Sequence, residues 1–391
     1  MNRKTVIVQF YRQPKYYKDF ACIGGNCPMN CCFGWRINWT NEEVEKLKNA
    51  DCSEHLRELI NSAFKENGDI YKIKMNEKNK CPLLTEDNFC SIQREIGAEY
   101  LSEVCMKYPR KSRVTGSVAL NYCYLSCYQV IHTLCNTDKC MVLENYLPKA
   151  KKVRSSDTYS EKAFLEHPEI KYDHDIFEFL YEIISDNSYS VETAVTLGAV
   201  AAQSISKLVD SGAYDKIPGN ISALKEQLKN PDQIKKLEEL KPNYAVKLGF
   251  VQEINKNVIK SNIMDIISED GVVNIDKYNY GMKMFNEYFA DRPFAMRNIA
   301  LNLLLELSMP FRDVGISIFE NYCYYAAAFA MYKMIAATAF LGKTDSYMNF
   351  ISSSAYLSRR FAHNNENVKR IINVFKELNC ASPAYIALIL K

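Results

Sequence analysis

The sequence predicts a mostly α-helical protein with two domains: an irregular, cysteine-rich N-terminal metal-binding domain over residues 1–140 and a helical C-terminal domain over residues 141–391. Three observations support this prediction. The chain of 391 residues is longer than one typical domain. Of its 14 cysteines, 12 lie before residue 141. Apolar residues recur with the 3.6-residue period of amphipathic helices through most of the second domain.

Helix signals begin with Thr40-Asn41-Glu42-Glu43, which has the form of a capping box with Thr40 as N-cap. This motif predicts a helix over residues 41–67. Strand signals are weak: residues 5–10 alternate, and residues 113–120 are compatible with a short strand pair. Apolar periodicity predicts further helices over residues 93–107, 175–185, 191–210, 247–268, 278–289, 294–307, 313–341 and 366–378.

Composition and charge exclude several classes of protein. Hydrophobic residues make up 48% of the chain and charged residues 24%, so it can bury a large core and is not disordered. A net charge of +3 is too small for a protein that coats nucleic acid. The N-terminal apolar run Val6-Ile7-Val8 is too short for a signal peptide, and the most apolar stretch, 321–342, contains Lys333. We therefore expect a cytoplasmic protein that binds neither nucleic acid nor a membrane.

The cysteines are the most informative residues. Dense cysteines form disulfides in short secreted chains, but this chain is long and shows no targeting segment. In a reducing compartment, clustered thiols are more often metal ligands or catalytic groups. Glycines and prolines lie between several of them, so the backbone can bend around an ion. We expect eight cysteines in four groups to form one metal-binding region: Cys22, Cys27, Cys31 and Cys32; Cys81 and Cys90; Cys105; and Cys127.

Eight thiols exceed the ligands that one four-coordinate ion requires. They suffice for two tetrahedral zinc sites, for one [4Fe-4S] cluster with spare thiols, or for two clusters. Their spacing matches neither the bacterial ferredoxin run nor a pair of zinc-finger knuckles, so these alternatives stay open. The other six cysteines are expected to pack as small apolar residues: Cys52, Cys123, Cys135, Cys140, Cys323 and Cys380.

The cysteine groups belong to longer motifs. Residues 17–37 follow the pattern Tyr-x-x-Asp/Lys-Phe-x-Cys-Ile-Gly-Gly-x-Cys and then Cys-Cys-x-Gly-Trp-x-Ile. Further pieces are Cys-Pro-Leu-Leu from Cys81, Cys-Ser-Ile-Gln from Cys90, Cys105 with Tyr-Pro-Arg at 108–110, and Ser126-Cys127. As a set, these motifs resemble the flagellin lysine-N-methylase family, and in looser form the small zinc- or iron-chelating cysteine-cluster proteins. The resemblance is dense over residues 9–130. In the second half it is limited to residues 294–305, with Arg297-Asn298, and to Ser358-Arg359 with His363.

The resemblance implies an enzyme that methylates lysine side chains of flagellin. It further implies S-adenosylmethionine as the methyl donor and an iron–sulfur cluster bound by the eight cysteines, with zinc as the alternative metal. Arg110, Arg297 and Asn298 are the residues expected to contact the cofactor. Arg110 and His363 are the residues expected to take part in catalysis.

Chemistry gives His363 and Arg110 these roles, with a structural alternative for each. A lysine ammonium has a reference pKa of about 10.4, so a base such as His363 must help to remove its proton; alternatively, His363 lies at a helix junction. Arg110 lies in a stretch without acidic residues, between Glu103 and Asp138. It would bind the carboxylate of a cofactor or offset the charge of a cluster; alternatively, it belongs to a solvated basic loop.

Two common cofactor motifs are missing from the sequence. It contains no Gly-x-Gly, so the usual Rossmann turn is absent, and no Cys-x-x-x-Cys-x-x-Cys run. The position of S-adenosylmethionine is therefore open. Two other functions also stay open: a non-catalytic zinc- or iron-binding module whose helical half recognises a protein partner, and electron transfer through a cluster.

Overall fold

The computed structural model of the chain describes residues 4–35, 37–147, 152–155, 159, 161–262, 265, 267–269, 272–342 and 344–391. It divides the chain into two compact units. The larger, which we call the helical unit, holds Met1–Asp19, Ser112–Ser126 and Val130–Lys391. The cysteine-rich unit holds Phe20–Lys111 and Cys127–Gln129.

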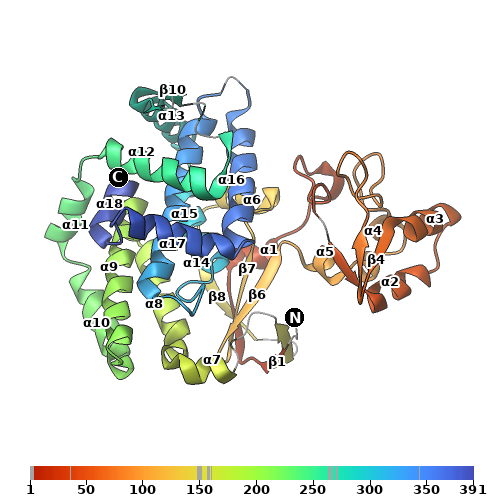
Figure 1. Ribbon diagram of the computed structural model, residues 1–391, viewed down its shortest axis with the longest axis horizontal. Helices are drawn as coiled ribbons and strands as arrows, with labels where there is room; N and C mark the ends of the chain where they lie inside the picture. The colour runs from red at the N-terminus through yellow and green to blue at the C-terminus, as the bar shows by residue number, and fades with distance from the viewer. Residues whose placement is uncertain are drawn as a thin grey trace. The chain divides into compact units, whose positions relative to one another are not determined.

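The helical unit is built around helix α15 (Ile318–Ala339), drawn in blue in Figure 1. This helix is apolar on all sides, and its residues from 321 to 339 are all buried. A helix of this composition belongs inside a core, because no face of it favours water. Its main packing partners are α9 (Val191–Asp210), α13 (Ile275–Tyr288), α16 (Ser346–Ala362) and α17 (Glu366–Glu377).

Shorter helices cover this core. Helix α8 packs against α9 and α14, and α18 packs against α9 and α12. Helix α12 continues into a π-helical turn over Asn255–Ile259. The remaining helices of the unit are α1 (Lys15–Asp19), α6 (Tyr128–Asn136), α7 (Glu161–Glu166), α8 (Asp173–Ser185), α10 (Ile217–Gln227), α11 (Pro231–Glu238), α12 (Tyr244–Ile254), α14 (Ala295–Glu306) and α18 (Pro383–Leu390).

A four-stranded sheet with the order β6-β7-β2-β8 completes the helical unit. Strand β2 pairs in parallel with β7 and antiparallel with β8, and α14 packs against β7. Gly116, with φ of +57°, lies in the turn between β6 and β7. The strands of the unit are β2 (Phe10–Pro14), β6 (Arg110–Thr115), β7 (Val118–Cys123) and β8 (Leu143–Tyr146), with the two-stranded pairs β1 (Lys4–Ile7) with β9 (Lys152–Ser155) and β10 (Ser268–Glu269) with β11 (Val272–Val273).

The cysteine-rich unit has a small sheet with the order β3-β5-β4, made of β3 (Asn38–Thr40), β5 (Ile70–Ile73) and β4 (Phe64–Asn67). Helices α2 (Asn41–Lys48) and α3 (Glu54–Ala63) lie beside it in the same compact core. Trp39 is buried in that core and packs edge-on against Phe64. Loops and two short helices, α4 (Ser91–Glu95) and α5 (Glu103–Lys107), carry most of its cysteines.

The mostly helical class is confirmed, and so is the capping box of Thr40, whose Oγ1 accepts a hydrogen bond from the Glu43 N–H. The single helix expected over 41–67 is wrong. Ser53 caps a second helix, and residues 64–67 form β4. The helix expected over 93–107 is also wrong, because the chain turns at Gly97, whose φ of +103° does not occur in a helix.

The two compact units do not coincide with the expected boundary at residue 140. Strands β2, β7 and β8 form one sheet, and this pairing draws residues 10–14 and 118–123 into the helical unit. The cysteine-rich unit is therefore an insertion between two strands of the helical unit. Among the described residues, no helix has both the length and the apolar character needed to cross a membrane. The apolar stretch at 321–342 lies mostly in the buried helix α15.

Candidate functional site

The first cysteine group lies on a loop that requires its two glycines. Gly24 has φ of +58°, a conformation that side chains other than glycine rarely adopt. A Cβ on Gly25 would lie 2.4 Å from the ring of Phe89, so only glycine allows this close approach. The two glycines form a short 3₁₀ turn between Cys22 and Cys27, which keeps these two thiols on one loop.

Hydrogen bonds join this loop to the second cysteine group. Asn30 Nδ2 donates to the carbonyl of Asn88 at 3.0 Å, and Asn30 Oδ1 accepts from the Cys32 N–H at 2.9 Å. The Cys81 N–H donates to the carbonyl of Cys32 at 3.0 Å. Asn30 therefore holds two cysteine loops together, a role that sequence reasoning missed. Its place between Cys27 and Cys31 was the available signal.

The third group and part of the second lie where short helices begin. Cys90 is the N-cap residue of α4, and Cys105 lies in the first turn of α5. The Cys105 N–H donates to Oγ of Ser102, the N-cap of α5, at 3.1 Å. The Ser102 cap stabilises the start of α5 and, with it, the position of Cys105, whereas the side chain of Cys90 makes no capping hydrogen bond.

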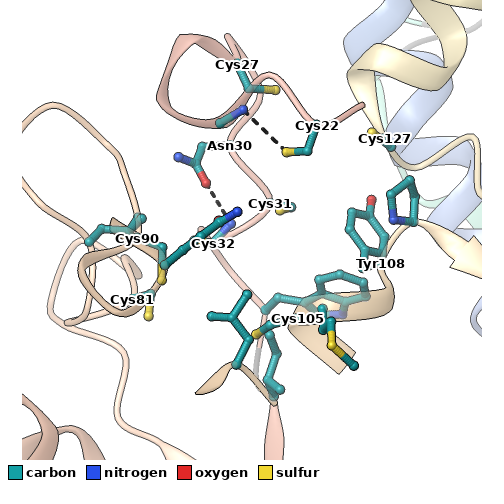
Figure 2. Close-up of a pocket in the computed structure, with 18 of the residues that line it drawn as sticks. Cys22, Cys27, Asn30, Cys31, Cys32, Cys81, Cys90, Cys105, Tyr108 and Cys127 are labelled. Atoms are coloured by element: carbon teal, nitrogen blue, oxygen red, sulfur yellow. Dashed lines mark hydrogen bonds between the residues drawn. The ribbon is translucent and has the colours of Figure 1, made fainter. Parts of the chain in front are cut away.

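All eight predicted cysteines line one cavity of about 260 Å³ (Figure 2). They reach it from loops, short helices and the segment that carries Cys127, so the eight thiols lie around one cavity. Cys22 is exposed, and the other seven are half-buried. The rest of the wall is mostly apolar and aromatic, with Phe20, Trp35, Trp39, Leu83, Ile92, Leu101, Met106 and Tyr108 among its residues.

The sulfur atoms surround the cavity rather than converge on one point. Within the described residues, no three His, Cys, Asp or Glu side chains come together closely enough to hold a metal ion. A metal-binding function of this region therefore stays a prediction. The six cysteines outside the four groups do not line the cavity; Cys52 is half-buried, and the other five are buried.

Five thiols of the cavity have a raised pKa and so favour their protonated form: Cys27, Cys32, Cys81, Cys90 and Cys105. Burial, together with neighbouring thiols, raises the pKa of Cys81 to about 11 and that of Cys105 to about 12. A hydrogen bond with Cys31, and then burial, raise the pKa of Cys32 well above its ordinary value. Thiolates so close together repel one another in a medium of low polarity. A bound cation would remove that cost, because metal binding displaces the protons of its thiol ligands.

Two further groups of this cavity could act on a charged ligand. Arg110 is the single charged side chain among the described residues that line it. Its Nη2 donates to the carbonyl of Phe20 at 2.6 Å, and its guanidinium lies 4.9 Å from the centre of the Phe20 ring. Trp39 is 1% exposed, and its Nε1–H has no hydrogen-bond partner. A buried N–H without an acceptor is uncommon and indicates a missing acceptor at this wall.

His363 lies in the helical unit, at the C-terminal end of α16. Its ring packs against Tyr124, with 4.4 Å between ring centroids, and its Nε2 lies 3.2 Å from Oγ of Ser126. The residue is exposed, so a protein side chain in solvent can reach it. The expected helix junction is present as well, because α17 begins three residues later at Glu366.

Arg297 and Asn298 lie on α14, and both face main-chain carbonyl groups. Arg297 Nη1 donates to the carbonyl of Ile184 at 2.7 Å. Asn298 Nδ2 donates to the carbonyls of Leu134 and Thr137 at 2.9 and 3.2 Å. Both residues also line a cavity of about 530 Å³ in the helical unit. These contacts give them a structural role, and their role in cofactor binding stays a prediction.

Sequence reasoning missed a buried carboxyl group, Glu306. It is 1% exposed, and burial raises its pKa to about 7. Its Oε2 accepts from the Leu125 N–H at 3.1 Å, and its Oε1 accepts from the hydroxyl of Ser358. The signal was the four-residue spacing of Asn298, Asn302 and Glu306 in a mostly apolar helix, which places three polar side chains on one face.

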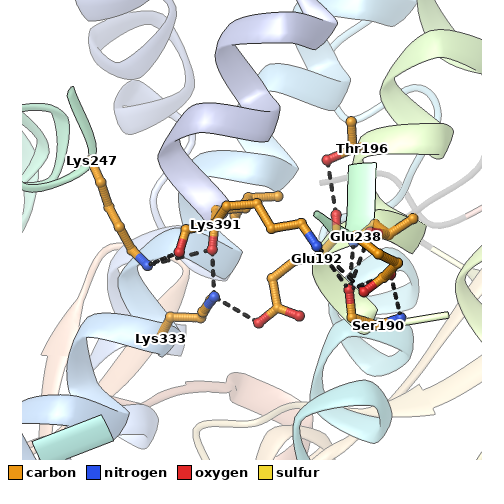
Figure 3. Close-up of polar contacts among 9 residues, drawn as sticks. Ser190, Glu192, Thr196, Glu238, Lys247, Lys333 and Lys391 are labelled. Atoms are coloured by element: carbon orange, nitrogen blue, oxygen red, sulfur yellow. Dashed lines mark hydrogen bonds and ion pairs between the residues drawn. The ribbon is translucent and has the colours of Figure 1, made fainter. Parts of the chain in front are cut away.

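A second buried polar cluster of the helical unit involves two lysines (Figure 3). Lys333 Nζ lies 2.6 Å from Oε1 of Glu192 and donates to the carbonyl of Leu390. Lys247 Nζ donates to the carbonyl of Lys391 at 3.0 Å. Burial, with the adjacent Lys333 ammonium, lowers the pKa of Lys247 to about 6. Burial opposes ionisation of Glu192, but Lys333 outweighs it and lowers the pKa of Glu192 to about 2.

Comparison with known proteins identifies a family that the chain resembles. Residues 177–389 match the family described as the FliB lysine N-methylase C-terminal domain. The chain is 25% identical over 250 residues to proteins named lysine-N-methylase from Salmonella typhimurium and Salmonella choleraesuis. This alignment covers 62% of the chain and spans 59% of the length of each of these curated relatives. A protein named flagellar biosynthetic protein FliU, from Salmonella muenchen, is 30% identical over 135 residues, which are 34% of this chain and 80% of that protein. No solved structure matches the chain.

Proposed function

The chain belongs to the FliB lysine N-methylase family, and from this membership we propose that it transfers methyl groups from S-adenosylmethionine to lysine side chains of a flagellin. The match over residues 177–389, more than half of the chain, carries the proposal. The names of the relatives support both parts of it, since two are lysine-N-methylases and one is a flagellar biosynthetic protein. The resemblance of the cysteine motifs supports the same reaction.

The reaction requires a neutral amine, and we assign the removal of the lysine proton to His363. The amine nitrogen then forms a bond to the methyl carbon, and the carbon–sulfur bond of the sulfonium breaks, leaving a neutral thioether. Because the sulfonium methyl is already electrophilic, the protein has chiefly to align the two groups and exclude water. The exposed position of His363 supports this role, and its contacts with Tyr124 and Ser126 hold the ring in one orientation.

Arg110 is our candidate for binding the carboxylate of S-adenosylmethionine. A guanidinium binds a carboxylate through charge-assisted hydrogen bonds, which are stronger than neutral ones. Arg110 is the one charged residue among the described residues that line the thiol cavity, which supports this assignment. The contacts with Phe20 restrict the side chain before a ligand arrives, so less entropy is lost on binding.

The residues around the cavity fit a metal centre. Among the described lining residues, eight thiols and no carboxylate form a set of soft donors that suits iron–sulfur clusters or zinc, and one guanidinium would offset part of the negative charge. The unpartnered Nε1–H of Trp39 would find an acceptor in a sulfur atom of such a centre. When bound, a cluster would supply a redox-active group, whereas zinc would supply structural stability. Residues that would hold it come from this set: Cys22, Cys27, Cys31, Cys32, Cys81, Cys90, Cys105 and Cys127.

Metal and sulfide analysis of anaerobically purified protein tests the metal centre. We expect iron with an equivalent amount of acid-labile sulfide and broad visible absorption, as in iron–sulfur proteins. A colourless protein with stoichiometric zinc would replace the cluster by a zinc site. Protein without either metal, but with reduced thiols, would contradict the assignment of the cavity.

Mass spectrometry of flagellin, co-expressed with this chain, tests the methylation. We expect a methyl mass increment on lysines, reduced about 100-fold or more by His363→Asn if the histidine is a general base. The matched control is His55→Asn, an exposed histidine on α3, which should change the yield by less than about twofold. No increment on any lysine, with the metal centre intact and the cognate flagellin present, would favour the non-catalytic binding module.

A further inference from the structure

His363 contacts a short segment of its own unit, residues 124–126, which connects β7 to the turn before α6. Its ring packs against the ring of Tyr124, with 4.4 Å between centroids, and its Nε2 lies 3.2 Å from Oγ of Ser126. Residues 124–126 belong to no helix or strand, so no regular backbone ladder fixes their path. The orientation of the His363 ring therefore depends on the side chains that hold this segment.

Two buried side chains of α14 bind the backbone of this segment and of the residue before it. Oε2 of Glu306 accepts a hydrogen bond from the Leu125 N–H at 3.1 Å. One turn earlier on the helix, Nδ2 of Asn302 donates to the carbonyl of Cys123 at 3.1 Å. Glu306 and Asn302 are 1% and 0% exposed. Because Leu125 lies between the two residues that contact His363, the carboxyl group fixes the centre of the segment.

Both of these side chains have a second partner inside the helical unit. Oε1 of Glu306 accepts from the hydroxyl of Ser358 on α16, and Oδ1 of Asn302 accepts from the hydroxyl of Tyr16 at 2.6 Å. Ser358 and Tyr16 are buried as well. Helix α16 ends at His363, its C-cap residue. Glu306 thus joins the segment that contacts the histidine to the helix that carries the histidine.

A carboxyl group in an apolar core costs free energy, so its presence on α14 calls for a reason. Catalytic groups have to be held within about 0.5 Å of their productive position, and a displacement of about 1 Å can lower a rate about 100-fold. On the premise of the base assigned above, we propose that Glu306 and Asn302 are positioning residues: they fix the backbone of residues 123–125 and thereby orient His363 for methyl transfer.

Two substitutions of Glu306 separate its hydrogen bond from its charge. Glu306→Gln keeps an oxygen that can accept from the Leu125 N–H, and its amide can donate to the hydroxyl of Ser358. Glu306→Met has a similar length but offers only a weak acceptor. We expect Glu306→Met to disturb the orientation of His363 and Glu306→Gln to preserve it. Equal disturbance in both variants would overturn the inference, because the charge would then be the property that matters.

The rate of flagellin methylation at varied flagellin concentration gives the first readout. Glu306→Met should lower kcat about 10- to 100-fold and change KM less than about twofold, because no contact with the substrate is removed. Glu306→Gln should stay within about threefold of the unsubstituted protein. In a His363→Asn background, Glu306→Met should lower kcat no further, since the ring through which it acts is missing. Additive losses would overturn the inference.

Nuclear magnetic resonance of the histidine rings gives a second readout that needs no substrate. The chain has five histidines, and His363→Asn identifies the signal that belongs to His363. Glu306→Met should shift and broaden this signal, because the ring then samples several orientations. Glu306→Gln should leave it in place.

A matched pair of buried asparagines extends the test to variants that keep Glu306. Asn302→Ala removes the contact with Cys123, whereas Asn321→Ala removes contacts of α15 with the carbonyls of Asp313 and Ser317. Both asparagines are 0% exposed, so both substitutions should lower the free energy of unfolding, which urea unfolding measures. Only Asn302→Ala should alter kcat and the ring signal of the histidine.

The outcomes separate this inference from the proposed base. A ring signal that is unchanged in Glu306→Met and Asn302→Ala, or changed equally in Asn321→Ala, would overturn the inference and leave His363 as the base. An unchanged rate in His363→Asn would refute the histidine as the base, and the inference with it. The methylation itself is judged separately by mass spectrometry of flagellin.

Discussion

The two units differ in what their interiors contain. The helical unit has a continuous apolar core around α15. The cysteine-rich unit has a smaller apolar core, which includes Trp39, and beside it a cavity lined by eight thiols. Small domains bury a smaller fraction of their surface and often need a metal or disulfides to fold. The difference teaches that packing of apolar side chains stabilises the helical unit, whereas we expect the cysteine-rich unit to depend more on a ligand for its thiols.

The largest expected effect is the loss of that ligand. Cys31→Ser and Cys32→Ser should each lose bound metal and soluble protein, because metal binding to a thiolate site contributes on the order of 10 kcal/mol to folding. Cys323→Ser and Cys380→Ser, in buried positions of the helical unit, should retain the metal. Metal analysis of the four purified variants gives the comparison. Equal metal content in all four would reject the assignment of the ligands to the cysteine-rich unit.

A buried ion pair tests how strongly packing inside the helical unit determines its stability. Arg113 Nη1 lies 3.1 Å from Oδ2 of Asp173, and the two side chains are 5% and 1% exposed. Arg113→Met should destabilise the unit by about 3–5 kcal/mol, because it leaves a buried carboxylate without its partner. The control is Arg94→Ala in the cysteine-rich unit, whose ion pair with Asp87 is exposed and should contribute nothing measurable. Urea unfolding measures both, and equal losses would contradict the difference between the two interiors.

The helical unit should also carry a pH dependence that comes from a buried lysine. The pKa of Lys247 is about 6 in the folded chain, against an ordinary value of 10.5. Between these values the unfolded chain binds a proton that the folded chain does not, so stability rises with pH and is lost as pH falls toward 6. The charged groups that face this amine are Lys333 and Glu192.

Lys247→Met tests this dependence. It should reduce the slope of unfolding free energy against pH by up to about 1.4 kcal/mol per pH unit between pH 7 and 9. Lys283→Met, an exposed lysine on α13, is the control and should leave the slope unchanged. An unchanged slope in Lys247→Met would mean that this lysine is charged in the folded chain.

Local signals predicted the helical unit better than the cysteine-rich unit. The helix over 191–210 was recovered at both ends, because its apolar period and the N-cap Ser190 agree. The strands β4 and β5 were not predicted, because each spans four residues and is stabilised by pairing rather than by its own sequence. Helix α16 was not predicted either, since Ser352-Ser353-Ser354 interrupts its apolar period.

The candidate site divides in the same way. The thiol cavity was predictable, because cysteine spacing is a local signal with a known chemical meaning. The buried polar contacts of α14 were not predictable. The hydroxyl of Tyr16, for example, donates to Oδ1 of Asn302, and these two residues are 286 positions apart in the sequence and meet only in the fold. The polar spacing on α14 indicated a buried stripe, but its partners follow from tertiary packing alone.

The smallest expected effect compares the same motif in both units. Thr40 and Ser317 each form a complete capping box, with Glu43 and Glu320. Thr40→Ala and Ser317→Ala should each cost about 1 kcal/mol, because each leaves the N–H at the third helical position without its acceptor. The loss of stability should affect the cysteine-rich unit in the first variant and the helical unit in the second, since the two helices belong to different units.

Unfolding followed by two probes separates the two costs. Metal release reports the cysteine-rich unit, and far-ultraviolet circular dichroism reports mainly the helical unit, which holds most of the helices. Thr40→Ala should shift the midpoint of metal release and leave the main helical transition in place; Ser317→Ala should do the reverse. If both substitutions shift both transitions equally, the units unfold as one cooperative body. The metal would then stabilise the helical core as well, and packing alone would not account for the stability of that unit.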